Sequence, residues 1–195
     1  MIPPRMKLSE TPDFNDGILT PSEGEIVRPV RTYPQHEVAF RDHCLNCGIT
    51  CYLPMRRAWK VSSVTSNGRE YNYSRETLRP MFASYVFVKT RAEHTRQLFE
   101  TNMITRILPV SDEAGFLEEL RTVRKVELVG YRQELEFHRD ILEGDRFIIL
   151  NGAWQGVTGY LVRRDKTFKW TVQIDFVNQQ VTTTINPSRY KMQRV

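Results

Sequence analysis

Three cysteines in residues 44–51 are the first candidates for chemistry in this chain. Cys44 and Cys47 have the spacing of a metal-binding pair, Cys51 follows them, and His43 precedes them. A structural zinc site needs four ligands, and a second pair elsewhere in the chain usually completes it. This sequence has no second CxxC or HxxxH pair. We therefore expect small, buried or half-buried thiols and no metal or other cofactor.

Catalysis is the next possibility to weigh. The best case for an enzyme is a reactive cysteine beside His43, or a general base at His94 or His138. No triad spacing, paired acid or phosphate-binding loop accompanies these residues. We therefore expect no catalytic residue, and a protein that works by binding.

Positive charge is concentrated in one segment of the chain. The net charge is +5, and residues 55–91 hold eight basic and two acidic side chains. Localised positive charge indicates a polyanionic partner such as nucleic acid, although a merely solvated basic surface is the alternative. The candidate nucleic-acid contacts are Arg56, Arg57, Lys60, Arg69, Arg75 and Arg79.

Apolar patterning predicts strands that alternate with helices in the first two thirds of the chain. We expect strands at 26–32, 49–53, 85–90 and 104–110, and helices at 35–47, 93–101 and 118–128. Asn67-Gly68 favours a hairpin turn, with arms at 58–61 and 69–73. The proline-punctuated residues 1–24 are expected to be disordered.

The pattern changes after residue 141. Five short strands are expected, at 146–150, 158–164, 169–176, 180–185 and 191–195, and they suggest a small closed barrel. Helices and strands followed by strands alone predict an α+β protein with two domains, 25–128 and 142–195, joined by a linker at 129–141. No apolar run is long enough for a membrane helix, and no secretory signal is present, so we expect a cytoplasmic protein without membrane contact.

Three motifs, taken in order, resemble the NusG-like transcription elongation factors. They lie at residues 48–54, 79–89 and 144–159, and the last resembles a KOW motif. More narrowly, the chain looks like the specialised antitermination paralogues of the RfaH and UpxY type. One departure is that the family often opens its first strand with Trp-Tyr, where this chain has Glu25-Ile26 or Ile26-Val27.

The resemblance implies an NGN-like domain, an antiparallel sheet flanked by helices, followed by a five-stranded SH3-like β-barrel, the KOW domain. It implies that an apolar patch of the first domain binds the clamp helices of RNA polymerase and suppresses pausing or termination. The candidates for this patch are Phe82, Tyr85, Phe87, Val27, Tyr52 and Leu53. The alternative for each side chain is simple core packing.

The resemblance also implies partners for the rest of the chain. The basic hairpin would reach upstream duplex DNA or the displaced non-template strand. The KOW domain would bind the small-subunit ribosomal protein NusE or the Rho factor through Phe147, Ile149 and Trp154, with Trp154 exposed at a turn. We expect a monomer. The alternative function is an RNA-binding or ribosome-associated KOW protein that uses the barrel and hairpin directly on RNA.

Overall fold

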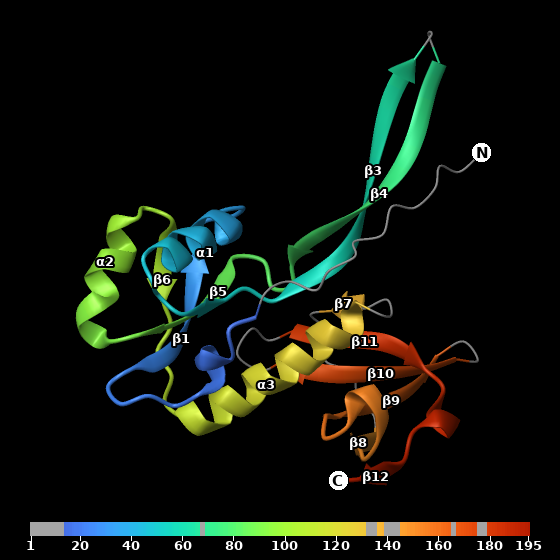
Figure 1. Ribbon diagram of the computed structural model, residues 1–195. Helices are drawn as coiled ribbons and strands as arrows, with labels where there is room; N and C mark the ends of the chain where they lie inside the picture. Colours follow the sequence, from blue (N-terminus) through green and yellow to red (C-terminus); the bar gives the residue numbers. More distant parts are fainter. Residues whose placement is uncertain (1–13, 67–68, 132–135, 139–144, 165–166, 175–178) are drawn as a thin grey trace.

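Figure 1 shows the computed structural model, which describes residues 14–66, 69–131, 136–138, 145–164, 167–174 and 179–195. The chain forms a four-stranded sheet with helices, a long hairpin that projects from it, and a C-terminal sheet. None of the helices in these residues is long and apolar enough to cross a membrane.

The N-terminal sheet is antiparallel, with the strand order β2-β5-β1-β6. Its strands are β1 (Ile26–Thr32), β2 (Cys51–Tyr52), β5 (Tyr85–Thr90) and β6 (Ile104–Ile107). Successive side chains of a strand point to opposite faces. In β5, Val86 and Val88 therefore join one hydrophobic cluster and Phe87 joins another. Both faces of the sheet are covered.

Helices cover the two faces. On one face, α1 (Glu37–Asn46) and α2 (Thr95–Glu100) pack Phe40, Cys44 and Leu98 against Val86 and Val88. On the other face lies α3 (Glu113–Gly130), and its N-cap is Asp112, whose side chain accepts a hydrogen bond from the N–H of Gly115 at 3.0 Å. Apolar side chains of α3 pack in one cluster with residues of both the N-terminal and the C-terminal sheet.

The hairpin is much longer than the sequence predicts. Strands β3 (Met55–Ser66) and β4 (Arg69–Pro80) pair over their whole length, from Met55 opposite Pro80 to Ser66 opposite Arg69. At the rise of an extended strand this gives a reach of roughly 35 Å. The hairpin projects away from both sheets (Figure 1).

The C-terminal sheet differs from the expected five-stranded closed barrel. Its six strands have the order β12-β8-β9-β10-β11-β7, and among the residues that the structure describes, β7 and β12 do not pair to close it. The strands are β7 (Glu136–His138), β8 (Asp145–Ile149), β9 (Thr158–Arg164), β10 (Thr167–Ile174), β11 (Gln179–Ile185) and β12 (Met192–Arg194). The extra strand β7 comes from the range expected as linker, because residues 136–138 pair with the edge of β11.

One glycine of the KOW-like motif has a packing reason. A Cβ atom at Gly159 in β9 would overlap the carbonyl oxygen of Thr171 and the ring of Trp170 in β10. Because Trp170 is fully buried, neither neighbour has room to move. The close approach of β9 to β10 therefore requires glycine at this position.

The N-terminal segment is also different from its prediction. Residues 1–13 lie outside the described part, but Asp16–Leu19 form a short 3-10 helix (η1). Ile18 at its centre has no exposed surface and belongs to the same cluster as α3. Disorder is therefore the wrong prediction for residues 14–24, because a buried side chain anchors them.

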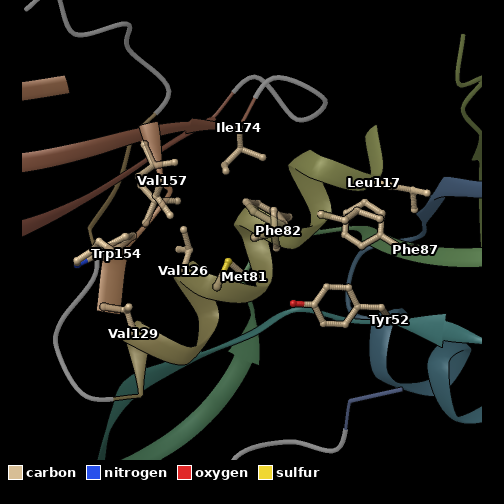
Figure 2. Packing of buried hydrophobic residues seen from close by; sticks show 14 of the residues in the cluster. Tyr52, Met81, Phe82, Phe87, Leu117, Val126, Val129, Trp154, Val157 and Ile174 are labelled. Atoms are coloured by element: carbon tan, nitrogen blue, oxygen red, sulfur yellow. The ribbon is translucent and has the colours of Figure 1, made fainter. Parts of the chain in front are cut away.

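A single hydrophobic cluster joins the N-terminal sheet, α3 and the C-terminal sheet. Figure 2 shows its centre, with Met81 and Phe82 from the turn after β4, Val126 and Val129 from α3, and Val157 from the C-terminal part. The two parts of the chain thus share a core in this arrangement. The domain limits 25–128 and 142–195 stay a prediction.

Candidate functional site

Most of the predicted polymerase-binding residues lie on the sheet face that α3 covers. Val27, Tyr52 and Phe87 are buried in the cluster with α3, and Tyr85 is half-buried against it. The ring centroid of Phe87 lies 6.1 Å from that of Tyr52 and 6.0 Å from that of Phe116 in α3. The fold brings these side chains together, but it places them inside the molecule.

Phe82 reaches the same cluster from the turn between β4 and β5. Ser84 in this turn has a left-handed φ of 65°, and its N–H donates to Glu37 Oε1 at 2.6 Å. The turn directs Phe82, which is 1% exposed, toward α3 and Ile174 (Figure 2). Leu53 lies apart from this set, because it packs in the second cluster with α1 on the opposite face of the sheet.

The predicted partner-binding residues of the C-terminal part enter the same cluster. Trp154 was expected to be exposed, yet it is 1% exposed. The expectation is wrong because the 3-10 helix Gly152–Trp154 (η3) turns the ring toward Val129 of α3 (Figure 2). Ile149 is fully buried, and Phe147 packs against the cluster from a half-buried position.

A polar contact fixes η3 on the helix. Lys125 Nζ, in α3, donates to the carbonyl oxygen of Gln155 at 3.2 Å. Together with the packing of Val126 and Val129, this contact holds η3, the turn of the KOW-like motif, against α3. Both predicted protein-binding surfaces therefore meet at one helix.

The N-terminal segment covers Tyr52 and its neighbours in β5 from another side. The ring of Phe14 meets Tyr52 edge-on, with 4.9 Å between centroids. Lys89, which is 8% exposed, donates from Nζ to the carbonyl oxygens of Gly17 at 2.9 Å and Thr20 at 2.6 Å, and to Ser22 Oγ at 2.6 Å. Sequence reasoning missed this contact, because it joins segments about seventy residues apart and has no local signature.

A buried carboxylate, also missed, connects α3 to the base of the hairpin. Glu127 is 1% exposed and accepts three hydrogen bonds: from the Tyr52 hydroxyl at 2.8 Å, from the Met55 N–H at 2.7 Å and from Arg124 Nη1 at 2.5 Å. Burial, together with the charge of Glu127, holds the pKa of Tyr52 well above its usual value. Glu127 therefore joins the sheet, the hairpin and α3.

The hairpin positions the basic side chains in two ways. The register places Arg56 opposite Arg79, so two like charges face each other across the strands, and it places Lys60 opposite position 75. Burial and the nearby charge of Arg79 lower the pKa of Arg56. Lys60 and Arg79 are exposed, whereas the side chains of Arg69 and Arg75 lie outside the described part.

Arg57 has structural partners instead. Its guanidinium lies 3.3 Å from the carboxylate of Glu76, which is 5% exposed, and 5.4 Å from the ring centroid of Tyr131. These contacts join β3, β4 and the end of α3. Arg57 therefore stabilises the base of the hairpin, whereas Lys60, farther along the strand, is exposed.

The candidates for metal and catalytic chemistry do not converge on one place. Cys44 and Cys51 are buried and Cys47 is exposed. Within the part of the chain that the structure describes, no three His, Cys, Asp or Glu side chains are placed to hold a metal ion. His94 lies 3.8 Å from Glu93, and the side chain of His138 is outside the described residues.

Comparison with known proteins adds the family. A search of curated proteins finds no match. A solved structure titled "Crystal Structure of MjSpt4:Spt5 complex conformation B" is 17% identical, covers 87% of this chain and 98% of that chain, and has a TM-score of 0.28. A family model described as "Transcription termination factor nusG" matches residues 28–126, which is just over half of the chain. The protein therefore belongs to the NusG family of transcription factors.

Proposed function

We propose that this protein is a transcription elongation and antitermination factor, specialised in the manner of the RfaH and UpxY type. Its aromatic set, Tyr52, Phe82, Tyr85 and Phe87, binds the clamp helices of RNA polymerase together with the neighbouring Val27. Binding of one clamp state in preference to others stabilises that state. Pausing and termination then become less frequent, and the protein makes or breaks no bond.

One observation carries the proposal: the aromatic set lies directly beside the base of the basic hairpin. Met81 and Phe82 follow Pro80, the last residue of β4, and Met81 N–H donates to the carbonyl oxygen of Pro54 at 2.7 Å. A protein surface and a basic arm that share one base can contact the polymerase and its DNA at the same time. Aromatic side chains supply large contact area at low entropic cost.

Because the aromatic set is buried, it must become exposed before polymerase can bind it. Phe82 and Phe87 are 1% and 0% exposed because α3 and the C-terminal sheet cover them. We infer that polymerase binds a form in which the C-terminal sheet has left α3 and α3 has moved off the N-terminal sheet. The same separation frees Trp154 and Ile149, which we propose as contacts to NusE or Rho.

The basic arm supplies the contact to DNA. Like charges directly opposite each other destabilise a hairpin, as at Arg56 and Arg79. A phosphate between two such side chains relieves the repulsion, and phosphate contacts give affinity without reading sequence. We therefore propose upstream duplex or non-template DNA as the ligand of this face.

The test uses two substitutions with opposite expected effects on binding to core RNA polymerase. Tyr85→Ala removes a half-buried ring of the set and is expected to weaken binding at least about tenfold, as for an interface hot spot. Val129→Asp places a carboxylate under Trp154, favours the separated form and is expected to strengthen binding. Tyr33→Ala, at a ring that is 48% exposed outside this set, is the matched control.

A pause assay on leader templates then measures the effect on elongation. Equal binding by all of these variants contradicts the proposal. A different result would support the alternative of an RNA-binding KOW protein. In that case Tyr85→Ala changes neither polymerase binding nor RNA affinity, and the C-terminal sheet binds RNA. Opposite shifts for Tyr85→Ala and Val129→Asp exclude general misfolding as the cause.

A further inference from the structure

Two cysteines outside the proposed interfaces face each other between α1 and β2. Cys44 lies in the last turn of α1 and Cys51 begins β2, and both belong to the second hydrophobic cluster. Cys51 Sγ donates to the carbonyl oxygen of Arg41 at 3.6 Å, one helical turn before Cys44. The Cys44 and Cys51 thiols also share a hydrogen bond. The sequence spacing gave no reason to expect this pairing.

The connection between the two cysteines is held in place. Gly48 has a φ of 72°, which ends the helix, and the N–H of Ile49 donates to the carbonyl oxygen of Cys44 at 2.8 Å. The chain therefore turns back sharply and brings Cys51 beside the helix. A disulfide between the two residues joins groups that are already neighbours, which is the first geometric requirement for such a bond.

Only one of the two cysteines borders a cleft, and it is 5% exposed. A cleft of about 410 Å³ is lined by Phe14, Asn15, Arg41, Leu45, Cys51, Tyr52 and Leu53. Cys51 is part of its wall, and Cys44, with no exposed surface, is not. A peroxide that enters this cleft meets Cys51 first.

The groups around the two thiols also indicate that Cys51 reacts before Cys44. The hydrogen bond from the Cys44 thiol and the nearby Arg41 guanidinium lower the pKa of the Cys51 thiol, whereas burial and the Asp42 carboxylate act against this lowering. The pKa of Cys44 is raised, because its proton is held in that hydrogen bond and because it is buried. The thiolate is the reactive form of cysteine, so Cys51 is the nucleophile of the pair.

We propose that Cys51 and Cys44 form a peroxide-sensitive dithiol switch. In the first step the Cys51 thiolate attacks one oxygen of hydrogen peroxide, the O–O bond breaks, and Cys51 sulfenic acid and hydroxide form. In the second step Cys44 sulfur attacks the Cys51 sulfur, the S–O bond breaks, and a disulfide and water form. Two thiols are oxidised and one peroxide is reduced, and an added dithiol reverses the reaction.

Cys47 is excluded from the switch by its position. It is exposed, and its Sγ lies 3.6 Å from His43 Nε2 on the outer side of the helix end. Disulfide formation ties the end of α1 to the edge strand β2, directly before Tyr52 and Leu53. The inference concerns this thiol pair alone and does not depend on polymerase binding.

The experiment uses the full chain with Cys47→Ser, so that only the buried pair remains. Hydrogen peroxide is added to the native protein, and free thiols are counted after denaturation. Peptide mapping without reductant is expected to find Cys44 linked to Cys51, with a mass about 2 Da lower than the reduced pair. Dithiothreitol is expected to restore both thiols.

Two further variants in the Cys47→Ser background assign the roles. Cys44→Ser removes the resolving thiol, so dimedone is expected to label Cys51 sulfenic acid. Cys51→Ser leaves Cys44 alone, and its labelling is expected to be at least about tenfold lower, because it is buried with its proton held. Absence of the Cys44–Cys51 link in the Cys47→Ser protein overturns the proposal, as does equal labelling of the two thiols.

Discussion

At the scale of single residues, Glu127 holds more of the molecule together than any motif in the sequence indicates. Glu127→Gln removes the charge that pairs with Arg124 and presents an NH₂ group to donors at Tyr52 and Met55. Breaking a buried, hydrogen-bonded ion pair costs about 3 kcal/mol of the free energy of unfolding. Urea denaturation followed by circular dichroism measures this loss.

The control lies on the same helix. Glu118→Gln breaks the pair with Arg121, which has the same spacing, but the Glu118 side chain is 73% exposed. Exposed pairs contribute little, so its effect is expected to stay within about 0.5 kcal/mol. Equal losses for the two variants would show that the buried network around Glu127 has no special weight.

The buried tyrosines predict a dependence on alkaline pH. Burial and the charge of Glu127 raise the pKa of both Tyr52 and Tyr131. Tyrosine in the unfolded chain ionises at about pH 10. The unfolded state therefore loses protons that the folded state keeps, so stability is complete below pH 10 and falls as pH rises above it.

The measurement is the urea midpoint at a series of pH values from neutral to alkaline. Tyr52→Phe removes one of the two groups and is expected to make the alkaline decline shallower. Tyr33→Phe alters a ring that is 48% exposed and serves as the control. An unchanged slope for Tyr52→Phe would contradict the assignment.

At the scale of elements, the contact between Lys89 and the N-terminal segment decides whether residues 14–22 are ordered. Lys89→Met keeps the apolar stem but removes all three hydrogen bonds to this segment. Amide hydrogen exchange in residues 14–22 is expected to become at least about tenfold faster, since local opening costs less. Mass spectrometry of the exchanged protein measures this change.

Exchange in α3 serves as the internal reference, because its own hydrogen bonds are untouched. Lys60→Met, on the exposed part of the hairpin, is the matched variant and is expected to leave residues 14–22 unchanged. If Lys89→Met also leaves them unchanged, Ile18 alone holds the segment.

Elements differ in how well sequence patterns predicted them. The strands at 26–32 and 85–90 match β1 and β5, because each has a sharp end and places apolar side chains in the core. The hairpin was predicted with short arms, although β3 and β4 each have twelve residues. Polar strands that bury few side chains have weak periodicity, so pairing with the partner strand sets their length.

At the scale of the whole molecule, the contact between α3 and the C-terminal sheet determines which surfaces are available. Val129 is 4% exposed, and an aspartate there brings a carboxylate into the apolar contact with Trp154. Burial of an unpaired charge costs several kcal/mol, so Val129→Asp is expected to separate the two parts. Small-angle X-ray scattering then reports a larger radius of gyration.

The neighbouring residue supplies the control. Leu128 is 41% exposed, so Leu128→Asp is expected to leave the radius of gyration unchanged. Circular dichroism checks that both variants keep their helices and strands. A compact Val129→Asp protein would show that the contact does not depend on the apolar stripe of α3.

The sequence alone was sufficient to predict the positive charge of the hairpin, the central strands and the β-rich C-terminal part. It was also sufficient to predict the family resemblance that the family model supports. These features depend on neighbours in the chain or on composition. The sequence grouped Phe82, Tyr85 and Phe87, and separately Ile149 and Trp154, as partner-binding side chains. Only the tertiary structure shows that both groups are packed around α3.

The physical reason is that an apolar side chain is equally suited to a core and to a docking surface. Which of the two it occupies depends on what covers it, and here the cover comes from distant parts of the chain. Glu127, Lys89 and the Cys44–Cys51 pair illustrate the same limit, since each acts through partners that only folding brings near. Local sequence determined the elements, and long-range packing decided what they expose.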